Sequence, residues 1–336
     1  MWYTWAMMNE ATENIYRLCI PIPFPLRNVN MYALREVQGQ DWALIDAGMG
    51  TPDAREALSE GLQEAGLEIK NLRTIVLTHH HPDHVGLSAE LQEQSGATVY
   101  MNPIDKAALG LLWSNTLEQR FERVSGFFTK HGLPPTELWY AKVDPAVMRY
   151  VLRVPPPDMV STVEDGQTLE LAGERYRVIW VPGHSDGQIV LFRERDGIFI
   201  AADHVLPRIT PNIGLYSEKD RPDPLGDYLA SLAKIADLPA SLVLPGHGEP
   251  FTDLKKRTLE IVAHHEERLN NILNMLAQRP QHAYDITTQL FGERLKNGEA
   301  RRMAAAEVLS HLEYLRFRGK VDQRHTKDGH IQYAMV

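Results

Sequence analysis

The sequence predicts an α/β protein with a layered main domain and a smaller helical unit at its C-terminal end. Short apolar runs typical of strands alternate with helical patterns through the first hundred residues, and this alternation favours helices packed on a sheet. Polar residues directly follow several of these apolar runs. From residue 253 onward the pattern changes to helices and a closing hairpin. We therefore expect domains at 1–252 and 253–336.

The elements of the main domain follow from short apolar runs and helical spacing. The first part predicts strands at 43–46, 74–78 and 98–100, with helices at 52–65 and 85–94. Strand patterns resume at 168–171, 176–181, 189–192, 198–201 and 242–244, and a helix is expected over 224–236.

A helical insertion, at about 103–157, interrupts this alternation. It ends at three consecutive prolines, Pro155 to Pro157, and is rich in large apolar side chains: Leu111, Leu112, Trp113, Phe121, Phe127, Phe128, Trp139 and Tyr140. Two interpretations are open. The insertion can be a pair of helices packed on the core, a cap whose aromatic side chains line an apolar pocket, or both.

The C-terminal unit is predicted to be winged-helix-like. Asp253 is a plausible N-cap for a long helix that runs to about Gln278 and stops before Pro280. Helices at about 284–291 and 299–316 follow, and then a hairpin that turns at Asp328-Gly329. Helices followed by a β-hairpin are the order of elements in a winged helix.

Composition narrows the setting in which the protein works. The net charge of −9 argues against a general affinity for nucleic acid backbone. A single cysteine, Cys19, rules out a disulfide within the chain and fits a reducing compartment. No apolar stretch is long enough to cross a membrane. Residues 1–7 lack the basic and long apolar segments of a secretory signal and can equally be an extension ahead of a start at Met8. We expect a cytoplasmic protein.

The segment from Thr78 to His84, Thr-His-His-His-Pro-Asp-His, carries the strongest chemical pattern. It lies between a predicted strand and a predicted helix, at the sheet edge where open α/β proteins bind ligands. Alternate side chains of an extended loop share a side, so His79 and His81 can approach one ion while His80 points away. Asp83 alone could be a helix N-cap. Four histidines and an aspartate within six positions instead predict a metal site.

Three later strand ends carry matching residues. His184 follows the strand predicted at 176–181 on a glycine-containing turn, Asp203 follows the strand at 198–201, and His247 follows the strand at 242–244 within Pro-Gly-His-Gly. Each is weak alone, but together with the first segment they predict a single metal centre.

With these residues the chain resembles the metallo-β-lactamase superfamily over roughly residues 12–252. The resemblance implies a four-layer αββα sandwich with two divalent ions at one edge. It implies that His79, His81 and His184 hold one ion, that Asp83, His84 and His247 hold the other, and that Asp203 bridges them. It implies that Asp46, in Ile-Asp-Ala-Gly, orients the metal-binding loop. Zinc suits these ligands best, and manganese and iron also fit.

The resemblance implies a hydrolase in which a hydroxide bridging the ions attacks a carbonyl, with Asp83 orienting it. Where zinc β-lactamases use a cysteine ligand, this chain has Asp203, which the resemblance associates with glyoxalase II-like thioesterases, lactonases and RNase Z-like phosphodiesterases. The aromatic insertion and the acidic main domain favour a small-molecule ester or thioester substrate. Two alternatives stay open. One is a phosphodiesterase or ribonuclease that uses the C-terminal domain to hold nucleic acid, and the other is a mono-iron persulfide dioxygenase.

Substrate contacts and partners are expected outside this motif set. Arg208, Tyr216 and Arg221 lie in a Pro- and Gly-containing loop after Asp203 that can border the pocket. Basic residues cluster around the hairpin: Arg316, Arg318, Lys320, Arg324 and Lys327. Acidic residues are interspersed among them and no aromatic platform for stacking bases accompanies them, which favours a solvated surface over a nucleic acid contact. The C-terminal unit can equally form a homodimer contact.

Overall fold

The computed structural model describes residues 8–112, 117–137 and 150–336. In this part of the chain the main domain contains two β-sheets. The first has seven strands in chain order, β1 to β7, and pairs antiparallel up to β4 and parallel from β4 to β7. Its strands are Met8–Thr12, Ile15–Pro21, Asn28–Arg35, Trp42–Ile45, Leu72–Val76, Thr98–Met101 and Val160–Thr162.

The second sheet has five strands in the order β12-β11-β10-β9-β8. Its neighbours are antiparallel except for β11 and β12, which run parallel. The strands are Thr168–Leu171, Glu174–Trp180, Ile189–Arg193, Ile198–Ala202 and Leu242–Pro245 for β8 to β12.

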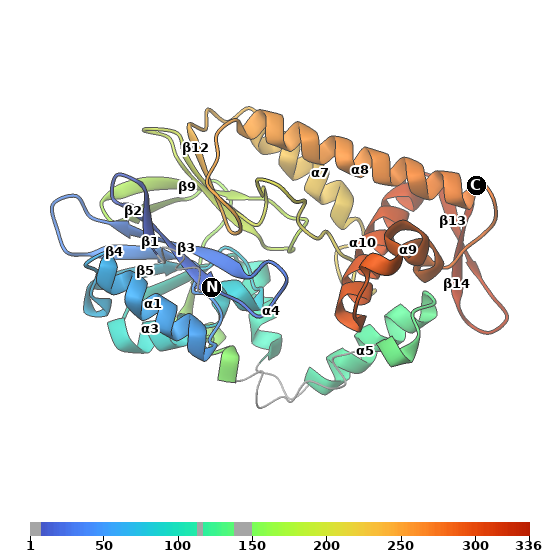
Figure 1. Ribbon diagram of the computed structural model, residues 1–336, viewed down its shortest axis with the longest axis horizontal. Coiled ribbons are helices and arrows are strands. Elements are labelled where there is room, and N and C mark those ends of the chain that lie inside the picture. Colours follow the sequence, from blue (N-terminus) through green and yellow to red (C-terminus); the bar gives the residue numbers. More distant parts are fainter. Residues whose placement is uncertain (1–7, 113–116, 138–149) are drawn as a thin grey trace, which may run out of the picture.

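The two sheets face each other and helices cover both outer faces, as expected for an αββα sandwich (Figure 1). Buried Tyr32 and Val76 of the first sheet pack against Val178 and Leu191 of the second. Helices α1 (Pro52–Glu64) and α3 (Ser88–Ser95) bury leucines on the other face of the first sheet. Helices α7 (Pro224–Ile235) and α8 (Leu254–Leu276) cover the second sheet. The predicted fold class is confirmed.

The helix expected at 85–94 is instead two helices, α2 (Pro82–Val85) and α3. The break lies at Gly86, where the chain bonds to a neighbouring loop instead of continuing the helical ladder. Its amide donates to the carbonyl of Gly48 at 2.6 Å, and a Cβ at Gly86 would stand only 2.8 Å from that oxygen. This close approach needs glycine and fixes the start of α3. Strands β1 to β3 and β7 were not expected from the sequence.

The insertion consists of α4 (Pro103–Leu112) and α5 (Leu117–Lys130) in the part that the structure describes. Phe127 and Phe128 are buried in one cluster with residues of the C-terminal unit, so these two aromatic rings belong to the core. Of the other large residues of the insertion named above, Trp113, Trp139 and Tyr140 lie outside the described part of the chain. Leu111 and Leu112 belong to α4 and Phe121 to α5.

The C-terminal unit follows the predicted order of helices and hairpin. It contains α8, α9 (Ala283–Phe291), α10 (Gly298–Phe317) and the antiparallel strands β13 (Val321–His325) and β14 (Ile331–Met335). Asp253 caps α8 by accepting a hydrogen bond from the amide of Lys256. One continuous apolar cluster joins Phe199 of the second sheet to Leu309 of α10. The division at residue 253 and the winged-helix description stay predictions.

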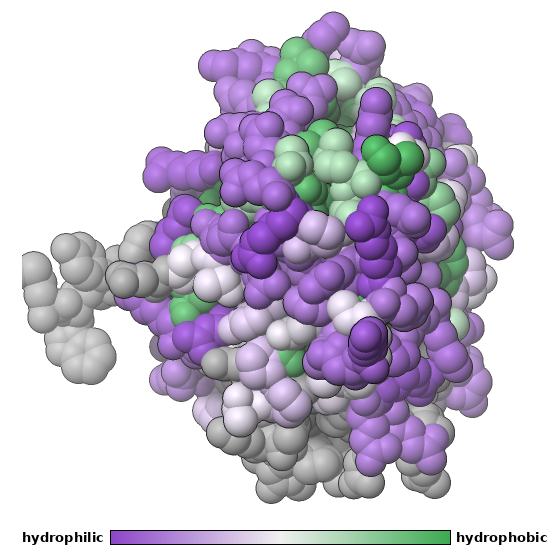
Figure 2. Space-filling view, turned by 90° about the vertical axis from the view of Figure 1, so that its right-hand side faces the viewer, coloured by the Kyte–Doolittle hydropathy of each residue, from purple (hydrophilic) through white to green (hydrophobic). Residues whose placement is uncertain are grey.

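The surface at the C-terminal end of the molecule is mostly hydrophilic, with a limited apolar patch (Figure 2). In the described residues, no helix has the length and apolar character needed to cross a membrane.

Candidate metal centre

The loop after β5 is held in place by Asp46. One carboxylate oxygen of Asp46 accepts a hydrogen bond from the amide of Thr78 at 2.8 Å, and the other accepts from the Thr78 hydroxyl at 2.9 Å. That hydroxyl lies 3.0 Å from Nδ1 of His79. Nδ1 of His79 is therefore engaged, and its Nε2 lies on the side of His81. Asp46 therefore bonds directly to the first residue of the histidine loop.

The first group of candidate ligands is His79, His81 and His184, whose ligand atoms lie within 4.8 Å of one another. Nε2 of His79 is 3.1 Å from Nδ1 of His81. His184 follows β9, and its Nδ1 donates to the backbone carbonyl of Asn212 at 2.9 Å. This hydrogen bond leaves Nε2 of His184 as the nitrogen that faces the other two rings.

The second group is Asp83, His84 and His247, again within 4.8 Å. Nδ1 of His84 is bonded to Asp46 at 2.7 Å, and Nδ1 of His247 donates to the carbonyl of Asn28 at 2.6 Å. Both rings therefore present Nε2 to the cluster. Asp83 Oδ2 lies 3.4 Å from Nε2 of His247 and 3.9 Å from Nε2 of His84.

Asp203 lies between the two groups. Its Oδ1 is 3.5 Å from Nε2 of His84, and its Oδ2 is 3.5 Å from Nε2 of His184 and 3.4 Å from Nε2 of His247. The carboxylate comes this close because residue 246 is glycine: a Cβ there would collide with Oδ1 of Asp203. All seven predicted residues are therefore brought together.

Divalent ions fit this donor set. Nε2 of His84, Nε2 of His184 and Oδ1 of Asp203 are buried atoms without a hydrogen-bond partner among the described residues. Buried polar atoms of this kind are costly unless something satisfies them. Imidazole nitrogens and carboxylate oxygens in this number are ligands for zinc and similar ions.

The protonation of the cluster is consistent with binding cations. Burial lowers the pKa of His79 well below its ordinary value, so this imidazole is in the neutral form that binds metal. Burial opposes ionisation of Asp203, but His247 and His84 hold its pKa well below the ordinary value. Burial alone would lower the pKa of His247, but the nearby carboxylates of Asp203 and Asp83 have the opposite effect and raise the pKa to about 10. Ion binding at His247 would therefore release a proton.

Asp105 was missed by the sequence analysis. Its buried carboxylate accepts hydrogen bonds from the amide of His80 at 2.9 Å, the hydroxyl of Ser185 at 2.7 Å and the amide of Gly187 at 2.8 Å. It thus ties the loop of His79 and His81 to the loop of His184. As the third residue of α4, Asp105 has the sequence appearance of an ordinary acidic residue in a first helical turn. The sequence carries no pattern that would have singled it out.

His80 belongs to none of the candidate ligand groups, and its Nδ1 lies 3.1 Å from Asp105. The histidines outside the motif do not join the candidate groups in the described residues. His265 and His311 instead form a buried pair between α8 and α10, with Nδ1 of His265 3.0 Å from Nε2 of His311. His131 is buried and stacks on Tyr333.

The three proposed substrate contacts have different surroundings. Arg208 is exposed. Tyr216 donates its hydroxyl hydrogen to Oδ1 of Asn212 at 2.7 Å. Arg221 pairs with Asp227 at 2.5 Å and lies over the ring of Trp180. Their roles toward substrate stay predictions, although Tyr216 bonds to the same residue whose carbonyl holds His184.

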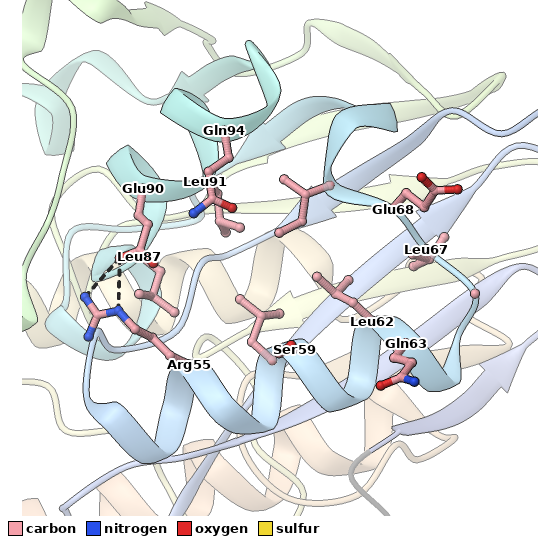
Figure 3. Close-up of a pocket in the computed structure, with 13 residues that line it drawn as sticks. Arg55, Ser59, Leu62, Gln63, Leu67, Glu68, Leu87, Glu90, Leu91 and Gln94 are labelled. Atoms are coloured by element: carbon pink, nitrogen blue, oxygen red, sulfur yellow. Dashed lines mark hydrogen bonds and ion pairs between the residues drawn. The ribbon is translucent and has the colours of Figure 1, made fainter.

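A groove of about 610 Å³ lies between α1 and α3 (Figure 3). Leu62 and Leu91 form part of its apolar wall, and the ion pair of Arg55 and Glu90, at 3.0 Å, closes one end. None of the seven clustered residues lines it, so this groove is separate from the metal centre.

Comparisons with known proteins agree with this geometry. Residues 24–247 match the family model described as metallo-beta-lactamase superfamily, and residues 269–336 match the model described as metallo-beta-lactamase-like, C-terminal domain. Among curated proteins, the chain is 29% identical over 288 residues to "Probable metallo-hydrolase YqjP" of Bacillus subtilis, covering 84% of this chain and 86% of that protein. It is 26% identical to "Beta-lactamase-like protein 2 homolog" of Drosophila melanogaster, covering 94% and 91%.

Two solved structures resemble nearly the whole chain. A metallo-beta-lactamase family protein from Thermus thermophilus is 36% identical with a TM-score of 0.82, covering 97% of this chain and 99% of that one. A beta-lactamase domain protein from Burkholderia ambifaria is 28% identical with a TM-score of 0.83, covering 98% and 93%.

Proposed function

Because the chain belongs to the metallo-β-lactamase superfamily and is a metallo-hydrolase of that family, we propose that its seven clustered residues hold two divalent ions. His79, His81 and His184 would hold one ion, Asp83, His84 and His247 would hold the other, and Asp203 would be a ligand of both. The single observation that carries this proposal is the position of Asp203, whose two oxygens lie 3.4–3.5 Å from histidines of both groups. Zinc is the ion we favour, with manganese and iron as alternatives.

The reaction that we propose is hydrolysis of a carboxylic ester or thioester. When bound, the two ions supply an activated water and a Lewis acid for the carbonyl oxygen. The contribution of the chain is to orient that water: Asp83, with a side chain 13% exposed, is more accessible than the other carboxylate of the cluster and can accept a hydrogen bond from it. No serine nucleophile is needed for this chemistry.

Exposed apolar side chains support an apolar acyl substrate. Phe24 and Leu26 are exposed in the turn that leads to Asn28, whose carbonyl holds His247. Met303 is also exposed, and its carbonyl accepts a hydrogen bond from the side chain of Asn212, whose own carbonyl holds His184. Exposed apolar groups on segments that are linked to His247 and His184 favour an acyl chain over a polyanion.

The nuclease alternative draws less support from the C-terminal unit. Of its basic side chains, Arg316 pairs with Glu313 at 2.7 Å and Arg318 pairs with Asp223 at 2.9 Å. The charges of these two arginines are thus partly neutralised, which weakens the case for a phosphate-binding surface.

A parallel assay on zinc-loaded protein tests the proposal. Acyl thioesters, esters and lactones are compared with a phosphodiester and a short single-stranded RNA, before and after removal of metal by a chelator. We expect turnover of the carbonyl substrates alone, lost on chelation, restored by zinc and little affected by salt. Cleavage of RNA that weakens steeply as salt rises would replace the proposal with the nuclease.

A further inference from the structure

His184 depends on a carbonyl that belongs to the loop between β11 and α7. Its Nδ1 donates to the carbonyl of Asn212, and its Nε2 faces the cluster without a partner among the described residues. The direction of this ring therefore rests on where the backbone at Asn212 is held. A histidine that binds metal through one nitrogen is generally oriented by the bond that its other nitrogen makes.

The side chain of Asn212 links that carbonyl to the C-terminal unit. Nδ2 of Asn212 donates to the carbonyl of Met303 in α10 at 3.2 Å. Oδ1 accepts the hydroxyl hydrogen of Tyr216 at 2.7 Å, and the guanidinium of Arg302, also in α10, lies 5.1 Å from the centre of the Tyr216 ring. Both ends of the amide are therefore engaged, one of them directly by α10.

The backbone between Asn212 and Tyr216 is bonded to the same helix. Ser310 of α10 donates its hydroxyl hydrogen to the carbonyl of Ile213 at 2.6 Å, and the amide of Leu215 donates to the carbonyl of Ala306 at 3.1 Å. Ile213, Ser310 and Ala306 are all buried. Buried hydrogen bonds of this kind fix a loop firmly, because breaking one leaves polar groups unsatisfied.

The groups that orient the other two imidazoles lie at strand ends of the first sheet. His247 is held by Asn28 at the start of β3, and His84 is held by Asp46 after β4. Of these three ligands, His184 is the one whose orienting carbonyl is anchored to α10. A substitution on α10 should therefore weaken ion binding at the site that contains His184 more than at the other candidate site.

We propose that α10 positions His184 through the segment 212–216, with Asn212 and Tyr216 as positioning residues for one metal site. This inference rests on the proposed two-metal centre. It gives the C-terminal unit a role inside the catalytic machinery, and it replaces substrate contact as the function of Tyr216.

Zinc titration against a competing chelator, on the full chain stripped of metal, tests the inference. Asn212→Ala should weaken one of the two zinc affinities by about 10–100-fold and leave the other unchanged. Tyr216→Phe and Ser310→Ala should weaken the same affinity by a smaller factor. His81→Ala identifies which affinity belongs to the site that contains His184. Tyr314→Phe, the same chemical change as Tyr216→Phe but at a residue of α10, should alter neither affinity.

The outcomes separate the alternatives. The inference would be overturned if Asn212→Ala and Tyr216→Phe bound both zinc ions with wild-type affinity. It would also be overturned if both affinities fell by the same factor. An unchanged zinc affinity with a raised KM in Tyr216→Phe would return Tyr216 to substrate contact. If Asn212→Ala fails to fold, the zinc affinities of Tyr216→Phe and Ser310→Ala test the inference in its place. Wild-type protein that binds two zinc ions but hydrolyses no ester would refute the proposed function and leave this inference standing.

Discussion

Asp46 accepts a hydrogen bond from Nδ1 of His84 at 2.7 Å, and both side chains are almost completely buried. The same carboxylate bonds the amide and hydroxyl of Thr78. Asp46 therefore fixes both the start of the histidine loop and the nitrogen that His84 presents to the cluster. A residue that binds no ion itself thus controls the geometry of two candidate ligands.

Replacing Asp46 should weaken metal binding without direct loss of a ligand. Asp46→Asn keeps the volume but removes the charge that orients His84, and we expect zinc affinity to fall by about 10–100-fold. Chelator competition measures the change. Asp53→Asn, at an exposed position of α1, is the matched control and should bind zinc as the wild type does. Equal affinities in the two variants would contradict this role for Asp46.

Asp83 is expected to be needed for turnover more than for folding. Its side chain is partly accessible beside His247, where it can both hold an ion and orient the attacking water. Asp83→Ala should lower kcat/KM by at least about 100-fold, with little change in the thermal unfolding midpoint. Asp158→Ala, at an exposed position, serves as the control. Full activity in Asp83→Ala would refute the proposed mechanism.

Gly246 leaves the space that Asp203 occupies. A Cβ at residue 246 would collide with Oδ1 of Asp203, so Gly246→Ala should displace this carboxylate and weaken zinc binding at both sites. Gly126→Ala, in the middle of α5 with no atom near the added Cβ, should bind zinc normally and gain about 0.5–1 kcal/mol of stability. If Gly246→Ala bound both zinc ions with wild-type affinity, zinc binding would not depend on the present position of the Asp203 carboxylate.

The buried pair His265 and His311 should make the protein less stable in acid. Nδ1 of His311 donates to the carbonyl of Glu307, which leaves its Nε2 to accept from Nδ1 of His265. Burial lowers the pKa of His265 to about 2 and that of His311 to about 3, so both stay neutral in the folded chain. In the unfolded chain they take up protons below about pH 6.5. The contribution of the two neutral histidines to the free energy of unfolding is complete above that pH and is lost as the pH falls toward 3.

Urea unfolding at pH 8 and pH 5 measures this effect. The double variant His265→Leu, His311→Leu should lose less stability between the two pH values than the wild type, by about 2 kcal/mol for each histidine. His325→Leu, at an exposed position of β13, should behave as the wild type does. A double variant that loses as much stability as the wild type would contradict the assignment.

The sequence predicted the candidate ligands well because each lies at or near a strand end. His79, Asp203 and His247 follow apolar runs that a sheet must bury, so their convergence at one edge could be anticipated. Many strand and helix positions followed from the same pattern. Strands β1 to β3 and β7 were missed, and at Gly86 a contact with the distant Gly48 splits one expected helix into two.

The supporting residues could not be found from the sequence. Asn28 and Asn212 hold His247 and His184 through backbone carbonyls, which any residue type would supply. Asp105 acts through hydrogen bonds to His80, 25 positions away in the sequence, and to Ser185, 80 positions away. The burial of Phe127 and Phe128 beside the C-terminal unit was one of two open interpretations, because an aromatic pattern does not distinguish a core from a pocket wall.

The number of divalent ions that the chain binds tests the central claim most directly. Protein stripped of metal is titrated with zinc, and the bound ions per chain are counted by elemental analysis after removal of free zinc. The arrangement of Asp203 between two groups of ligands predicts two ions for the wild type, with binding impaired at both sites in Asp203→Ala. A single ion that Asp203→Ala retains, or no bound ion at all, would contradict the two-metal centre.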